Sequence, residues 1–109
     1  MKKLCYYVPE SHLEATKAAL FAAGAGRIGD YAECCWQVEG SGQFRPLEGS
    51  TPHLGRTGEL EIVPEYRVEM LCAPDNLKRV LAALRDAHPY EEPAWDVSDV
   101  LAPGAGRET

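Results

Sequence analysis

The sequence predicts an α+β domain made of two successive strand–helix–strand units. Apolar residues alternate, as in half-buried strands, in the segments 3–8, 33–39, 60–72 and 94–100. Within residues 11–23, and again within residues 74–87, apolar residues recur at spacings of three and four, as on the buried face of a helix. Two such units close most simply into a ferredoxin-like βαββαβ sandwich, with two helices on one face of a four-stranded antiparallel sheet. Because no helix is left for the other face, we expect a homo-oligomer.

The length and charge of the chain limit its organisation and its partners. With 109 residues it has room for one hydrophobic core, which we assign to residues 1–101, followed by a frayed tail at 102–109. A net charge of −6 argues against nucleic acid or an anionic membrane as the main partner. The first apolar run stops at Pro9, and no apolar stretch approaches the ~20 residues that span a bilayer. We therefore expect a cytoplasmic protein.

The first helix has recognisable start and stop signals. Ser11 and Glu14 have capping-box spacing, so the helix begins at Ser11, or two residues earlier if Pro9 is its first residue. Gly24 is expected in the left-handed conformation that ends many helices. The predicted inward-facing stripe is Leu13, Thr16, Leu20 and Ala23.

A long glycine-rich connection separates the two units. The second strand is expected to begin at Tyr31 or Glu33 and to end at Glu39, with Cys34, Trp36 and Val38 pointing inward. Glycines and prolines in 40–58 disfavour regular structure there, so we expect an ordered loop that packs against another subunit.

The second unit contains two prolines with positional meaning. Pro64 interrupts the third strand, where we expect a bulge or an edge position. Pro74 opens the second helix, whose inward stripe is expected at Leu77, Val80, Leu81, Leu84 and Ala87. This helix is expected to stop at His88, because Pro89 disfavours a helical conformation before it.

The four cysteines are expected to be small buried hydrophobes of strands, at positions 5, 34, 35 and 72. Cys34 and Cys35 should point to opposite faces, which disfavours a disulfide between them. No C-x-x-C motif supports a structural zinc site.

The segment 88–93, His-Pro-Tyr-Glu-Glu-Pro, is the densest cluster of functional residue types. A divalent metal ion is one possible ligand, held by His88, Glu91 and His53. The alternative is a connection in which His88, outside the core, ends the helix and the glutamates face solvent. The first hypothesis predicts zinc binding that His88→Ala abolishes without unfolding the protein.

The glycine-rich loop supplies the other candidate residues. Gly42, Phe44, Arg45 and Pro46 form a rigid segment with an aromatic ring and a guanidinium, both common at interface anchors. Arg27 has a donor for an anionic ligand or a partner carboxylate, although anchoring the loop is the alternative role. The G-x-G-x-x-G at 24–29 ends a helix instead of opening one, so it does not predict a nucleotide site. No residue pattern predicts a catalytic group, and we expect no enzyme activity.

Three motifs occur together in a recognisable order: 24–31, 40–46 with Gly49 and Pro52, and 88–97. The sequence resembles, over residues 3–101, a stand-alone version of the domain inserted in bacterial members of the NGG-interacting-factor-three-like family. One local departure from the family's pattern is Cys35, where a serine is common.

The resemblance implies a PII/CutA-like fold, a trimeric assembly and partner contacts through the loop at 40–58. The nucleotide-binding motifs of PII proteins are absent here, and so are the flanking halves that hold the family's dinuclear metal site. A non-catalytic oligomeric domain that binds a small ligand or a protein partner is therefore the predicted function. A divalent-metal-binding protein is the alternative, and a small hydrolase a weaker third.

Overall fold

The computed structural model describes residues 1–101, so the predicted tail at 102–109 lies outside the described range. Its four strands are β1 (Lys2–Val8), β2 (Trp36–Phe44), β3 (Glu61–Cys72) and β4 (Trp95–Asp99). Its two α-helices are α1 (Leu13–Ala22) and α2 (Leu77–Ala87), and each follows directly on a 3₁₀ turn, Glu10–His12 or Pro74–Asn76. The element order confirms the two strand–helix–strand units.

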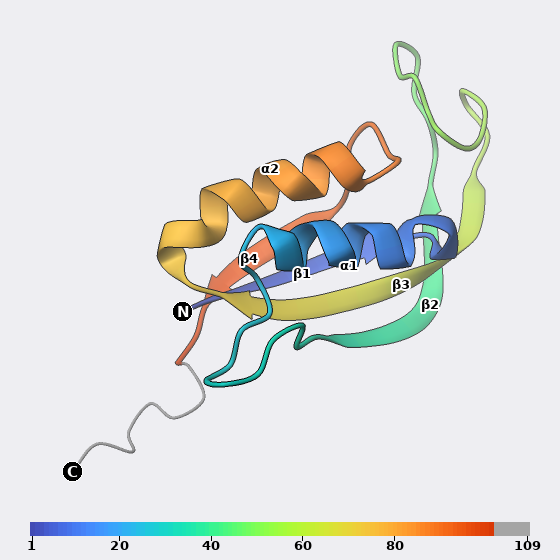
Figure 1. The fold of residues 1–109 in the computed structure, drawn as a ribbon. Coiled ribbons are helices and arrows are strands. Elements are labelled where there is room, and N and C mark those ends of the chain that lie inside the picture. Colours follow the sequence, from blue (N-terminus) through green and yellow to red (C-terminus); the bar gives the residue numbers. More distant parts are fainter. Residues whose placement is uncertain (102–109) are drawn as a thin grey trace.

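The strands form one antiparallel sheet in the order β2-β3-β1-β4. Figure 1 shows α1 and α2 side by side over the same face of this sheet, which leaves the other face without a helix. The ferredoxin-like βαββαβ prediction is confirmed.

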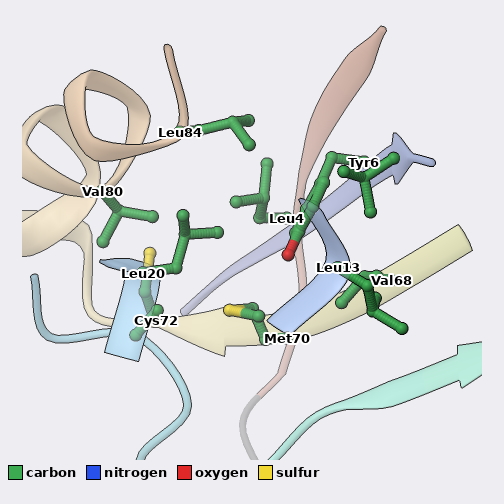
Figure 2. Close-up of a cluster of buried hydrophobic side chains, with 11 residues drawn as sticks. Leu4, Tyr6, Leu13, Leu20, Val68, Met70, Cys72, Val80 and Leu84 are labelled. Carbon is green, nitrogen blue, oxygen red and sulfur yellow. The ribbon is translucent and has the colours of Figure 1, made fainter. Parts of the chain in front are cut away.

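The core lies between the sheet and the two helices. Leu4, Tyr6 and Val8 of β1 are fully buried because alternate strand residues point to the helical side. Figure 2 shows the side chains that meet them from the neighbouring elements: Val68, Met70 and Cys72 of β3, Leu13 and Leu20 of α1, and Val80 and Leu84 of α2. The helix stripes predicted from the spacing are confirmed at these positions.

One polar group in the core belongs to Tyr6, and it is satisfied locally. The Thr16 hydroxyl donates to the carbonyl of Leu13 at 2.9 Å, which leaves its oxygen to accept from the Tyr6 hydroxyl at 3.0 Å. Burial raises the pKa of Tyr6 to about 12. The pair therefore stays neutral and links β1 to α1.

The ends of α1 differ in how well they were predicted. Ser11 does not cap the helix, because its Oγ bonds the Nδ1 atom of His12 and the chain enters through the 3₁₀ turn after Pro9. The other end is a Schellman motif, in which Ala25 N donates to Leu20 O and Gly24 N donates to Phe21 O. Gly24 has a φ of +110°, which confirms its left-handed conformation.

Strand β2 begins and ends later than predicted. It starts at Trp36, and it continues through the glycines to Phe44, because all nine of its residues pair with β3. Trp36 and Val38 lie opposite Glu69 and Arg67 on the helix-free face and are 59% and 43% exposed, so the predicted inward orientation is wrong.

The conformation of the residues just before β2 explains why the strand begins later than predicted. Glu33 has a left-handed φ of +58°, and the Cys34 amide donates to Gly26 O at 2.8 Å. Both Cys34 and Cys35 are therefore outside the strand and half-buried, whereas Cys5 and Cys72 are buried strand residues as expected.

Strand β3 contains Pro64 without a bulge. The register with β2 runs uninterrupted from Glu61 to Glu69, and β1 pairs with β3 only from Tyr66 onward. Pro64 therefore lies at an edge, where its missing N–H removes no ladder hydrogen bond. Within residues 1–101, neither helix has the length and apolar character needed to cross a bilayer.

Candidate binding cavity

A cavity of about 380 Å³ lies where the β2–β3 connection faces the segment between α2 and β4. One wall comes from residues 43–54, and another from Tyr90, Glu91, Glu92 and Ala94. Tyr7 of β1 and Glu65 of β3 complete the lining. In Figure 1 the connection extends from the ends of β2 and β3, beyond the helices. A cavity of this size is in the range of small-molecule sites.

Contacts from the end of β2 and from the β2–β3 connection hold both against the 88–94 segment. The backbone amide of Thr51 donates to Oε1 of Glu91 at 2.9 Å. The rings of Phe44 and Tyr90 meet with their centroids 5.8 Å apart. The loop itself is closed by Gly58 N, which donates to Pro46 O at 2.7 Å. The cavity is therefore shaped by contacts within one chain.

His88 connects the 88–94 segment to the end of α2 and to β1. Its amide donates to Leu84 O and ends α2, as predicted. Its Nε2 lies 2.6 Å from Tyr7 O, and its Nδ1 accepts the Tyr90 amide at 3.1 Å. These partners assign the neutral tautomer with the proton on Nε2. Burial lowers the pKa of His88, which favours the same neutral form.

The side chain of His88 is only 6% exposed. The expectation that His88 lies outside the core is therefore wrong, although its role at the helix end is confirmed. Pro89 explains both results, because it forces His88 into an extended conformation that turns the ring toward β1.

Tyr90 is the centre of an aromatic cluster beside the cavity. Its ring centroid lies 4.9 Å from that of His88 and 6.2 Å from that of His53. His53 in turn meets His12 edge-on at 5.7 Å. The cluster joins the loop, the 88–94 segment and the start of α1.

The Tyr90 hydroxyl is buried without a hydrogen-bond partner among residues 1–101. Burial and the nearby Glu65 carboxylate raise the pKa of Tyr90, so the phenol is neutral. The Glu65 side chain lies over Gly42, where a Cβ would meet the carboxylate. A buried hydroxyl without a geometric partner in the chain can be satisfied by water, by a small shift of the neighbouring Glu65 carboxylate or by a bound molecule.

The structure brings together most of the residues selected from the sequence. Phe44, Arg45, Pro46, His53 and Glu91 all line the cavity. Arg27 and Gly42 are not in its lining, and Gly42 belongs to β2. His88 lies behind Tyr90 instead of in the wall.

Sequence reasoning missed Tyr7 and Glu65, which line the cavity from the strands, and Tyr90. The only sequence signal for them was weak: Tyr90 stands inside the 88–93 motif, and Glu65 follows the proline that marks the strand edge.

The predicted metal ligands are not arranged as a metal site. Both ring nitrogens of His88 are occupied by Tyr7 and Tyr90, so a metal at either atom would replace a hydrogen bond. Within residues 1–101, no three His, Cys, Asp or Glu side chains form a group that could hold a metal ion. Divalent-metal binding stays a prediction without geometric support.

Comparison with solved structures defines the fold. The fold matches CutA1 from Pyrococcus horikoshii with a TM-score of 0.69 and 16% identity, over 98% of this chain and 90% of that one. It matches the PII-like protein CutA from Nostoc with a TM-score of 0.65 and 17% identity, over 92% and 81% of the two chains. The chain has a PII/CutA-like fold.

No family model matches the chain, but its sequence is similar to one part of longer proteins. It is 43% identical to a Bacillus cereus protein related to NIF3, with a TM-score of 0.76 over 88% of this chain and 24% of that one. Proteins named GTP cyclohydrolase 1 type 2 homolog are 47% identical in Mycobacterium tuberculosis and 46% in Bacillus subtilis, over 97% and 92% of this chain. The chain is therefore similar to one domain-sized part of NIF3-related proteins, and it spans only 28% and 27% of the two GTP cyclohydrolase 1 type 2 homologs.

Proposed function

We propose that the chain is a non-catalytic, oligomeric binding module whose ligand or partner enters the cavity between residues 43–54 and 90–94. The observation that carries this proposal is the preformed cavity itself, whose walls are fixed by the Thr51–Glu91 hydrogen bond and the Phe44–Tyr90 contact. Binding sites are commonly placed on loops that a rigid scaffold positions. Here the scaffold is the sheet, and the loop is the long β2–β3 connection.

The cavity lining supports binding more than catalysis. Ser50 is the one hydroxyl of the loop wall that offers a nucleophile, and it donates to Leu47 O at 2.7 Å. No base within residues 1–101 is bonded to its oxygen. The relatives are named as homologues of a cyclohydrolase, but the chain spans about a quarter of their length, so their names carry no activity to this domain.

The helix-free face supports the oligomeric part of the proposal. Trp36 and Val38 expose apolar surface there, and a second cavity of about 290 Å³ lies beside Trp36, between Lys3 and Cys34. A second copy that covers this face would bury both side chains, and the trimer implied by the resemblance is the assembly we favour. Trp36→Glu should convert that assembly to monomers of about 12 kDa in light scattering. A wild-type protein that is monomeric at micromolar concentration would contradict the oligomer.

A small library of neutral, cationic and anionic fragments tests the cavity. In ¹⁵N–¹H correlation spectra, the amide shifts of binding fragments should cluster at residues 43–54 and 90–94. Ala94→Trp, which places a large side chain in the lining, should remove these shifts, whereas Ala82→Trp on the exposed side of α2 should leave them. Hits that cluster elsewhere, or that survive in Ala94→Trp, would contradict the assignment.

A further inference from the structure

The charge of the cavity lining indicates what kind of ligand it takes. Three carboxylates surround it, those of Glu65, Glu91 and Glu92, against a single guanidinium from Arg45. Among residues 1–101, none of these four groups forms an ion pair. Three unpaired carboxylates around one hollow produce a negative potential, which attracts cations and repels anions.

The three carboxylates differ in depth. Glu91 and Glu92 are exposed, and one oxygen of Glu91 already accepts the Thr51 amide. Glu65 is half-buried on β3, over Gly42 and near the Tyr90 hydroxyl. Glu65 is therefore the carboxylate of the lining that is most shielded from solvent, where water and salt screen an ion pair least.

The apolar part of the lining indicates that the ligand has an apolar stem as well as a positive charge. The rings of Tyr7, Phe44 and Tyr90 line the cavity together with Pro46 and Pro52. Aromatic faces attract ammonium and guanidinium groups, and apolar walls accommodate the methylene stem that carries such a group. Apolar walls do not stabilise an inorganic cation, and no cluster suited to a metal ion is present in the described part of the chain.

We propose that this cavity binds an organic cation, an alkylammonium or alkylguanidinium group whose charge pairs with Glu65 and whose stem lies against Tyr7, Phe44 and Tyr90. The inference rests on the proposed function and specifies the ligand class of the same cavity. An ammonium that pairs with Glu65 also reaches the Tyr90 hydroxyl, whose oxygen accepts a hydrogen bond that no described residue supplies. The same chemistry is offered by a free diamine and by a lysine side chain.

A series of ligands with one stem and different charges tests the proposal. Pentylamine, pentanol and pentanoate are titrated into the full chain by calorimetry and by amide shifts. Pentylamine should bind about tenfold or more tightly than pentanol, because a hydrogen bond between two charged groups is stronger than one that involves a neutral hydroxyl. Pentanoate should not bind. Cadaverine and a peptide with one internal lysine then distinguish the two sources of the cation.

Glu65→Gln keeps the size of the side chain and removes its charge. It should weaken pentylamine binding about tenfold and leave pentanol binding unchanged, while Glu59→Gln, outside the cavity, should change neither. If Glu65→Gln fails to fold, Glu92→Gln, which is exposed and outside every strand, should weaken pentylamine binding up to about fivefold.

The outcomes separate the two proposals. Equal or tighter binding of pentanol or pentanoate at residues 43–54 and 90–94 overturns the organic cation and leaves the cavity as the binding site. If no ligand of this series or of the fragment library shifts those residues, both proposals fail. Pentylamine binding that Glu65→Gln does not weaken also overturns the pairing with Glu65.

Discussion

The Nε2 atom of His88 lies 2.6 Å from the carbonyl oxygen of Tyr7, so the end of α2 is bonded to the end of β1. The same ring accepts the amide of Tyr90 through Nδ1. One buried imidazole therefore positions the segment that forms a wall of the cavity, and the cavity depends on a residue that does not line it.

Replacing His88 tests this role. His88→Ala leaves Tyr7 O and Tyr90 N without partners in a buried site, so it should lower the free energy of unfolding by about 2–3 kcal/mol. His88→Gln can still donate to Tyr7 O and should cost less. Urea denaturation checks both, with His12→Ala as a histidine control. An unchanged urea midpoint in His88→Ala would contradict the account.

The stability should also depend on pH through His88. Burial lowers its pKa in the folded state, with smaller opposing effects from Tyr7 O and Glu65, and His12 and His53 lower it further. The unfolded chain therefore binds the proton at a higher pH than the folded one. The contribution of neutral His88 is complete above the unfolded pKa of about 6.5, and it is lost as the pH falls through the lower folded pKa.

Thermal unfolding between pH 7.5 and 5 measures this effect. The melting temperature of the wild type should fall more steeply below pH 6.5 than that of His88→Gln, which has no imidazole at this position. Parallel curves for the two proteins would show that another group controls the pH dependence.

Removing the unpartnered hydroxyl of Tyr90 should not destabilise the protein, in contrast to removing the imidazole of His88. Tyr90→Phe removes a buried polar atom that has no partner in the described chain and keeps the ring contacts to Phe44 and His88. It should leave the free energy of unfolding unchanged or raise it by up to about 1 kcal/mol. Tyr90→Leu, which also removes the ring contacts, should lower it. A clear loss of stability in Tyr90→Phe would mean that the hydroxyl is bonded.

Alanine substitutions at two glycines should differ in their effect on stability, because only one of the two positions requires glycine. Gly26 has a φ of +81°, and a Cβ there would lie 2.7 Å from Cδ1 of Phe21. Gly26→Ala should therefore lower the free energy of unfolding by about 2 kcal/mol or more. Gly40 has an ordinary strand conformation with open space around it, so Gly40→Ala should be neutral or slightly stabilising. Equal urea midpoints for the two variants would contradict this difference.

The fold was predictable because local patterns and pairing agree over most of the chain. The stripe with Leu20 on α1, the stripe with Val80 and Leu84 on α2 and the left-handed Gly24 are confirmed by the structure. Strand β2 was misplaced because local propensity was overruled. Its glycines disfavour a strand, yet pairing with β3 carries the strand to Phe44.

The candidate site was also only partly predictable, because the sequence indicates which residues lie in connecting segments but not which strand residues lie beside them. Neighbouring glycines and prolines mark Phe44, His53 and Glu91 as residues of connecting segments. The structure places all three around one cavity, although Phe44 is the last residue of β2. Tyr7 and Glu65 come from strands. Alternation predicts the face of a strand residue but not the loop that lies beside it, so these two residues needed the structure.

Residues 43–54 and 90–94 close a cavity in the free chain, and the contact between Phe44 and Tyr90 tests this closure most directly. Their ring centroids lie 5.8 Å apart, so protons of the two rings should be within nuclear Overhauser range. A NOESY spectrum of the unliganded protein should show cross-peaks between the Phe44 and Tyr90 ring protons, and Phe44→Leu serves to assign them. Resolved ring signals without such cross-peaks would show that the loop does not dock and that the cavity does not form.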